Sequence, residues 1–175
     1  PPPPPHTTTM VSSSAASDVY KRQGRRHVPF ELLKFRTMRH EPHRGLEITR
    51  RGDPRITRVG RLLRRTKLDE LPQLWNVLRG EMSLVGPRPE VRKYVERFRD
   101  EYDRILDVRP GLTDDASIAY RSEESILAEA DDVERTYVEV VLPAKIALSR
   151  RYVEEMSFTK DVGVMFRTLC AVMMP

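Results

Sequence analysis

The chain has 175 residues, with 31 Lys and Arg against 26 Asp and Glu, so its formal net charge is +5. Its hydrophobic fraction of 39% suffices for one modest core and excludes wholesale disorder. A single cysteine, Cys170, excludes an internal disulfide framework and a zinc site built from several cysteines. No apolar run in the sequence approaches the roughly 18 residues that a membrane-spanning helix needs.

The charge is unevenly distributed along the chain. Residues 25–67 contain 14 basic residues against 4 acidic ones, whereas residues 90–134 contain 14 acidic residues against 7 basic ones. A strongly basic half indicates a polyanion, a phosphorylated ligand or an anionic membrane surface as partner. Solvated helix faces explain the same charges without any partner, so both interpretations stay open on charge alone.

The first 23 residues lack apolar periodicity and the hydrophobic core of a signal peptide. They combine a proline tract with runs of Thr and Ser. Residues 13–23 (SSAASDVYKRQ) are identical to the translation of a transposase adapter that is common in DNA sequencing. We therefore hypothesise that residues 1–23 are a disordered, non-native tail and that one folded domain spans residues 24–175.

A short strand or extended segment is predicted over residues 29–38. In an extended conformation Leu33 and Phe35 share one face, while Lys34 and Arg36 share the other. A polar loop is expected over residues 39–53.

A cationic amphipathic helix should follow this loop. Asp53 fits the N-cap position with Pro54 at the first helical position. Four apolar residues then recur at helical spacing: Ile56, Val59, Leu62 and Leu63. Five arginines stand among them. Its arginines suit nucleic acid, an anionic bilayer or solubility alone.

A second helix is predicted from the spacing of Leu71, Leu74, Trp75 and Leu78, with Gly80 as its stop signal. Just before it stand Asp69 and Glu70. Thr66 and Asp69 match a loose capping box, so helix capping alone explains the acidic pair.

A strand-like run over residues 82–85 precedes the turn GPRP at residues 86–89. Each proline fixes its own φ and restricts the residue before it, so Arg88 is held between two rigid positions. An arginine restrained in this way is suited to binding a phosphate.

The rest of the chain reads as mostly helical, which gives an α+β fold with short strands and amphipathic surface helices. One apolar stripe is expected in the core: Val91, Tyr94, Val95, Phe98 and Tyr102. Another stripe, at Val162, Met165, Phe166, Leu169 and Met173, either packs on the domain or lies on a membrane surface.

Three stretches together point to a known family: KFRTM at residues 34–38, DPRITRVGRLLR at 53–64, and LDELPQLWNVLRGEMSLVGPRP at 68–89. They closely resemble the bacterial sugar transferases, which are monotopic polyprenyl-phosphate phosphoglycosyl transferases. The similarity is dense over residues 30–89 and looser beyond, where RPGLT at 109–113 matches a later turn of the family.

The resemblance implies that residues 24–175 form a membrane-associated catalytic domain. Such enzymes move a phospho-sugar from a UDP-sugar to undecaprenyl phosphate, in the first membrane step of glycan synthesis, and require Mg²⁺. The family's acidic pair falls on Asp69 and Glu70. Asp69 would be the nucleophile that forms a covalent phospho-sugar intermediate, and Glu70 would assist through the metal or a proton. Lys34, Arg36 and Arg88 are the candidate ligands of the substrate phosphates or nucleotide.

The family also carries an N-terminal hydrophobic membrane segment. We therefore expect the natural protein at the cytoplasmic face of the bacterial inner membrane, with a lipid surface and no nucleic acid as partner. Two alternatives compete with this interpretation. One is an Arg-rich nucleic-acid-binding domain that uses residues 55–65, and the other is a peripheral membrane scaffold without catalysis. Neither gives Asp69 and Glu70 a purpose.

Overall fold

The computed structural model describes residues 17–39, 48–49 and 52–173. Its strands form two separate two-stranded sheets. In one, β1 (Ser17–Gln23) pairs antiparallel with β2 (Pro29–Phe35), and in the other, β3 (Ser83–Val85) pairs in parallel with β4 (Gly111–Thr113).

Helices make up most of the described chain, so the predicted α+β fold with short strands is confirmed. The α-helices are α1 (Arg58–Thr66), α2 (Gln73–Leu78), α3 (Arg92–Arg97), α4 (Arg99–Ile105), α5 (Asp115–Ala119), α6 (Glu123–Ala128), α7 (Val133–Thr136), α8 (Leu142–Glu155) and α9 (Phe158–Met173). The other helical turns are the 3₁₀ turns η1 (Arg25–His27) and η2 (Leu68–Glu70) and the π-helical turn η3 (Tyr137–Val141).

Strand β1 lies within the segment that we predicted to be disordered, and for residues 17–23 this prediction is wrong. The register runs from Ser17 opposite Phe35 to Gln23 opposite Pro29. The physical reason is that a lone strand leaves a row of N–H and C=O groups unpaired, and β1 satisfies one edge of β2. Residues 1–16 lie outside the described residues, and the adapter origin of the tail stays a hypothesis.

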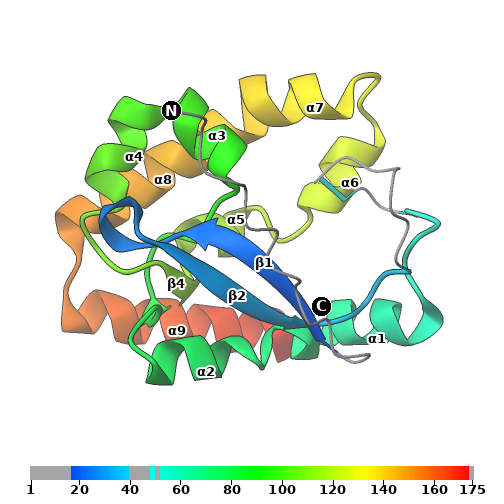
Figure 1. Ribbon diagram of the computed structural model, residues 1–175, viewed down its shortest axis with the longest axis horizontal. Coiled ribbons are helices and arrows are strands. Elements are labelled where there is room, and N and C mark those ends of the chain that lie inside the picture. Colours follow the sequence, from blue (N-terminus) through cyan, green and yellow to red (C-terminus); the bar gives the residue numbers. More distant parts are fainter. Residues whose placement is uncertain (1–16, 40–47, 50–51, 174–175) are drawn as a thin grey trace, which may run out of the picture.

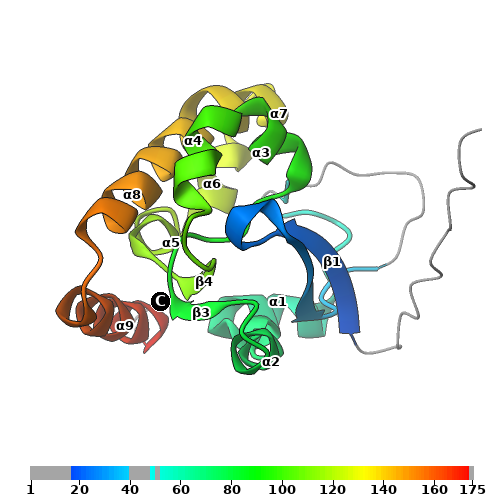
Figure 2. The ribbon, with the colours of Figure 1, turned by 60° about the vertical axis from the view of Figure 1, so that its left-hand side comes forward.

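Two groups of helices lie on opposite sides of the β1–β2 ribbon. Figure 1 and Figure 2 both place α1, α2 and α9 along the lower side and α3, α4 and α7 along the upper side. The upper group contains the main apolar core, which includes the predicted stripe on α3 and α4. Its buried members are Ile48, Tyr94, Val95, Tyr102, Ile105, Leu106, Leu127, Val133, Tyr137, Val138, Val141, Leu142 and Ile146.

A smaller cluster joins β2 to the segment around α2. Phe30 and Leu32 of β2 pack against Met82, with Val77 of α2 partly buried beside them. Side chains alternate along a strand, so Lys34 continues the face of Phe30 and Leu32. This alternation carries the Lys34 ammonium group from the strand toward α2.

Helix α1 begins later than predicted. Thr57 is its N-cap and accepts a hydrogen bond from the Gly60 N–H at 2.9 Å. Asp53, which we expected at that position, instead receives a forked pair of hydrogen bonds from the Arg55 guanidinium, the shortest 2.7 Å long. Most of the predicted loop before it lies outside the described residues.

Helix α2 presents its apolar side to solvent. All four residues of the pattern that predicted the helix are exposed, from 41% for Leu74 to 77% for Leu78. The buried side instead carries polar residues: Asp69 just before the helix, then Gln73 and Asn76. Helix α9 likewise exposes its predicted stripe, while Val164 packs against Val85 and Tyr152. Among the described residues, no helix is long and apolar enough to cross a membrane.

Candidate functional site

Asp69, in the turn η2 just before α2, forms an ion pair with Lys34 of β2. The Lys34 Nζ lies 2.8 Å from Asp69 Oδ2 and 3.7 Å from Glu70 Oε1. The Asp69 side chain is only 2% exposed, whereas that of Lys34 is 24% exposed. Lys34 therefore covers the carboxylate on the side that opens to solvent.

Glu70 binds Arg88 through a forked ion pair. The Arg88 Nη1 and Nη2 atoms donate to Glu70 Oε2 at 3.0 Å and to Oε1 at 2.8 Å. Nη1 also donates to the Leu112 carbonyl oxygen of β4 at 2.5 Å. The two carboxylates and two cations thus form one cluster drawn from β2, η2 and the GPRP turn.

The turn that carries Arg88 is fixed to β4. The backbones of Gly86 and Gly111 approach so closely that a Cβ on Gly111 would stand 2.1 Å from the Gly86 nitrogen. Asp114, fully buried at the N-cap of α5, accepts from the Ser117 N–H at 2.7 Å and lies 3.4 Å from the Arg88 nitrogen. Asp114 was not predicted as a site residue, although an Asp three residues before a Ser at a helix start is a recognisable cap.

The two cations keep Glu70 ionised. Burial by itself raises the pKa of Glu70, but the charges of Arg88 and Lys34 outweigh it and hold that pKa at about 2. At neutral pH the cluster therefore contains ionised Glu70 beside two cations that can bind phosphate oxygens.

The contacts do not support the capping interpretation of the acidic pair. Thr66 is the last residue of α1, and its hydroxyl donates to the Leu62 carbonyl oxygen at 2.9 Å. The N-cap of η2 is Lys67, and no side chain caps that turn. Asp69 is bound to Lys34 instead, so the Thr66–Asp69 capping box is absent among the described contacts.

Of the predicted phosphate ligands, the structure brings Lys34 and Arg88 to the acidic pair. Arg36 lies just beyond the end of β2 and is partly buried, and its place in a phosphate clamp stays a prediction.

The donor set is compatible with Mg²⁺. Among the described residues, no group of three or more His, Cys, Asp or Glu side chains could hold a metal ion by itself. Mg²⁺ is commonly bound through one or two carboxylates together with substrate phosphates, and Glu70 supplies such a carboxylate. The residues present therefore fit a magnesium ion that binds together with a diphosphate.

Two buried amides behind the cluster escaped the sequence analysis. Asn76 ties α2 to β2, because its Oδ1 accepts from the Leu33 N–H at 3.2 Å and its Nδ2 donates to the Glu31 carbonyl at 2.8 Å. Gln73 is completely buried one helical turn after Asp69. Gln73 lies four residues and Asn76 seven residues after Asp69. At this spacing the three polar side chains form a stripe on one side of the helix, opposite the leucines that predicted it.

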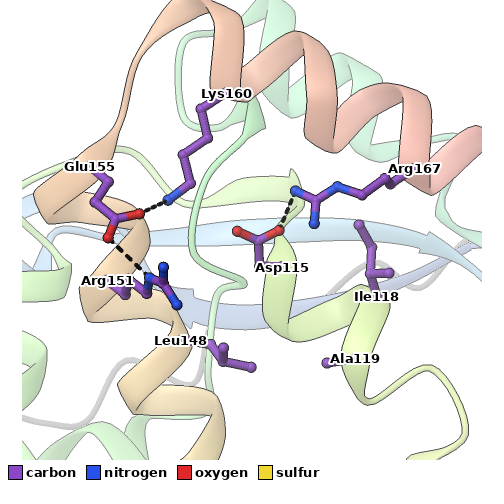
Figure 3. Close-up of a pocket in the computed structure, with 8 residues that line it drawn as sticks. All are labelled: Asp115, Ile118, Ala119, Leu148, Arg151, Glu155, Lys160 and Arg167. Atoms are coloured by element: carbon purple, nitrogen blue, oxygen red, sulfur yellow. Dashed lines mark hydrogen bonds and ion pairs between the residues drawn. The ribbon is translucent and has the colours of Figure 1, made fainter.

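A separate pocket of about 450 Å³ lies between α5, α8 and α9, shown in Figure 3. None of the four clustered charges lines it. Its own charges pair with one another: Arg167 with Asp115 at 2.6 Å, and Glu155 with both Lys160 at 2.9 Å and Arg151 at 3.0 Å. Each cation of this pocket is therefore already paired with one of its carboxylates.

Comparison with known proteins identifies a matching family and several similar relatives. Residues 8–175 match the profile of the family described as bacterial sugar transferase. The chain is 34% identical over 170 residues to the UDP-galactose-lipid carrier transferase of Erwinia amylovora, an alignment that covers 88% of this chain and 32% of that protein.

Two further relatives carry related names. One is the UDP-N-acetylgalactosamine-undecaprenyl-phosphate N-acetylgalactosaminephosphotransferase of Aeromonas hydrophila, 35% identical over 89% of this chain and 34% of its own length. The other is the UDP-glucose:undecaprenyl-phosphate glucose-1-phosphate transferase of Caulobacter vibrioides, 38% identical over 81% of this chain and 51% of its own length. The chain thus spans about a third of the first two relatives and half of the third.

Proposed function

Because the chain belongs to the bacterial sugar transferase family, we propose that it transfers a sugar phosphate from a UDP-sugar to undecaprenyl phosphate and releases UMP. The names of three relatives specify this class of donor or acceptor. The observation that carries the proposal is the cluster of Asp69 and Glu70 with Lys34 and Arg88. Phosphoryl transfer needs cations for the phosphate oxygens and a nucleophile, and this cluster offers both.

In the first step, an Asp69 carboxylate oxygen attacks the phosphorus atom that carries the sugar. A new oxygen–phosphorus bond forms, the bond from that phosphorus to the bridging oxygen breaks, and UMP leaves with the electron pair. Lys34 and Arg88 bind the phosphate oxygens, where they stabilise the charge of the transition state. This exchange of partners also withdraws Lys34 from Asp69 and exposes the carboxylate.

In the second step, a phosphate oxygen of undecaprenyl phosphate attacks the same phosphorus atom. The bond to Asp69 breaks, the carboxylate is restored, and the lipid diphosphate sugar is the product. Splitting one transfer into two displacements is the usual advantage of a covalent intermediate. A bound Mg²⁺ ion would neutralise phosphate charge, and Glu70 is the side chain that would hold it.

The exposed apolar residues suit an enzyme with a lipid acceptor. Helices α2 and α9 lie along the same side of the molecule (Figures 1 and 2), and each buries one face and exposes the other. We assign the exposed faces to the membrane surface. The residues of this apolar face are Leu71, Leu74, Trp75, Leu78, Phe158, Val162, Met165, Phe166, Leu169 and Met173. Exposed Arg58, Arg61 and Arg65 of α1 lie nearby and suit anionic headgroups.

The decisive experiment tests Asp69. The full chain is incubated with Mg²⁺ and a panel of UDP-sugars, without lipid acceptor, and UMP release and peptide masses are measured. We expect a phospho-sugar adduct on the peptide that contains Asp69, and we expect Asp69→Asn to lose at least about 10³-fold in turnover because an amide is a poor nucleophile. An active Asp69→Asn variant, or an adduct on another peptide, would contradict the proposal.

A further inference from the structure

Three polar atoms beside the charged cluster are buried without a partner. Among the residues that the structure describes, Asp69 Oδ1 and both side-chain polar atoms of Gln73, Oε1 and Nε2, accept or donate no hydrogen bond. Gln73 is 0% exposed and Asp69 is 1% exposed. Buried polar groups are nearly always hydrogen-bonded, so such atoms call for a physical explanation.

The backbone brings these atoms to the same side of one helical segment. Leu71 and Pro72, which link η2 to α2, both have right-handed helical dihedrals. Side chains four residues apart on a helix are neighbours, and each leans toward the preceding turn. Gln73 therefore leans back toward Asp69, and its carboxamide N–H is the chemical complement of the Asp69 Oδ1 acceptor.

The two oxygens of Asp69 have different surroundings. Oδ2 lies against Lys34, whose side chain is partly exposed, whereas Oδ1 is buried and accepts no hydrogen bond from the described part of the chain. An attacking oxygen must be reachable by substrate. Oδ2 becomes reachable when Lys34 turns to a phosphate, but Oδ1 does not.

We propose that Gln73 is a positioning residue for Asp69: its carboxamide N–H donates to Oδ1 and fixes the carboxylate so that Oδ2 is the oxygen that attacks. This inference rests on the proposed function, in which Asp69 is the nucleophile. A bond between these two groups would satisfy a buried donor and a buried acceptor at once. Gln73 touches no reacting atom in this arrangement, so it acts through Asp69.

One arm of the test measures the pairing without any substrate. Thermal unfolding is compared for the unaltered chain, Asp69→Ala, Gln73→Met and the double variant. Methionine has the length of glutamine but no hydrogen-bonding amide. We expect Gln73→Met to lower the melting temperature of the unaltered chain and to have a smaller effect in the Asp69→Ala background, because the bond is already lost there. Additive shifts would overturn the pairing.

The second arm measures turnover. We expect Gln73→Met to lower kcat by about 10- to 100-fold with little change in the KM for the UDP-sugar, since a misplaced nucleophile slows chemistry more than binding. Gln73→Glu keeps the shape but replaces the donor by an acceptor, and it should lose at least as much. A kcat within about twofold of the unaltered chain for either variant would overturn the positioning role.

Leu127→Ala is the matched control for a purely structural change. Leu127 is fully buried in the large helical core and belongs to neither the charged site nor the small cluster of Phe30, Leu32 and Met82. It should lower the melting temperature but leave kcat unchanged per folded molecule. If the unaltered chain releases no UMP with any UDP-sugar, the proposed function fails and the positioning role fails with it, whereas the unfolding cycle still reports whether the two side chains are bonded.

Discussion

Arg88 shows how charge and shape make separate contributions at the scale of one residue. Its guanidinium group spans both oxygens of Glu70 and the Leu112 carbonyl, a geometry that a lysine ammonium group cannot reproduce. We therefore expect Arg88→Lys to lower kcat/KM for the UDP-sugar by about 10- to 100-fold. The melting temperature should change little, because the side chain lies at the surface of the cluster rather than in an apolar core. Near-normal kinetics in this variant would contradict a bidentate role.

Glu70 makes the free energy of unfolding depend on pH in the acidic range. Its pKa is about 2 in the folded chain against an ordinary value of 4.5, so the unfolded chain binds a proton first as the pH falls. The stabilisation is complete above pH 4.5 and is lost as the pH falls toward 2. Urea unfolding without divalent cations should therefore show a steeper acid loss in the unaltered chain than in Glu70→Gln, by on the order of 3 kcal/mol. Parallel curves for the two proteins would show that Arg88 and Lys34 do not stabilise the carboxylate.

Helix α2 illustrates a conflict between pattern and burial at the scale of an element. Its leucines and Trp75 have the spacing of a core helix, yet the opposite, polar side is buried against β2. This inversion is stable because Asn76 supplies hydrogen bonds to the strand backbone and Lys34 neutralises Asp69. The apolar side is then available for a lipid surface.

Trp75 is the sole tryptophan of the chain, so its fluorescence reports directly on the apolar face. Adding vesicles of anionic phospholipid should shift its emission to shorter wavelength. Phe166→Glu, on α9, should weaken vesicle binding by about tenfold or more, since burying one large apolar side chain contributes about 1.5–3 kcal/mol.

Val140→Glu is the control for this binding experiment. Val140 is nearly as exposed as Phe166, at 61% against 67%, but belongs to η3 rather than to α1, α2 or α9. It should leave the emission shift unchanged. Equal losses from the two variants, or no shift in the unaltered chain, would remove the membrane from the assignment of this face.

At the scale of the whole molecule, stability and activity draw on different clusters. Leu127 is fully buried in the large helical core, whereas Met82 is buried beneath α2 in the small cluster that faces the charged site. Replacing either with Ala should cost about 2–5 kcal/mol of unfolding free energy. We expect Met82→Ala also to lower kcat at a temperature where both variants are folded, because Met82 packs against β2, which carries Lys34, and beside Val77 of α2. Identical turnover in Met82→Ala and Leu127→Ala would show that the small cluster does not position the site.

The sequence by itself determined much of this protein: the α+β class, the strands around residues 29–35 and 83–85, the core stripe of α3 and α4, and the kinship that singles out Asp69, Glu70, Lys34 and Arg88. These features follow from the local spacing of residues and from contiguous motifs, both of which can be read directly from the sequence.

Only the tertiary structure decided which side of each element is buried and which residues pair. The spacing of Leu71, Leu74, Trp75 and Leu78 is the same whether that side of α2 is buried or exposed, and only packing against β2 selects the polar side for burial. The start of α1 at Thr57 and the ordering of β1 depend on partners distant in sequence, because a cap or a strand edge is chosen by competing hydrogen bonds. The partners of the acidic pair come from β2 and the GPRP turn, so the site exists only when folding joins residues 34, 69, 70 and 88.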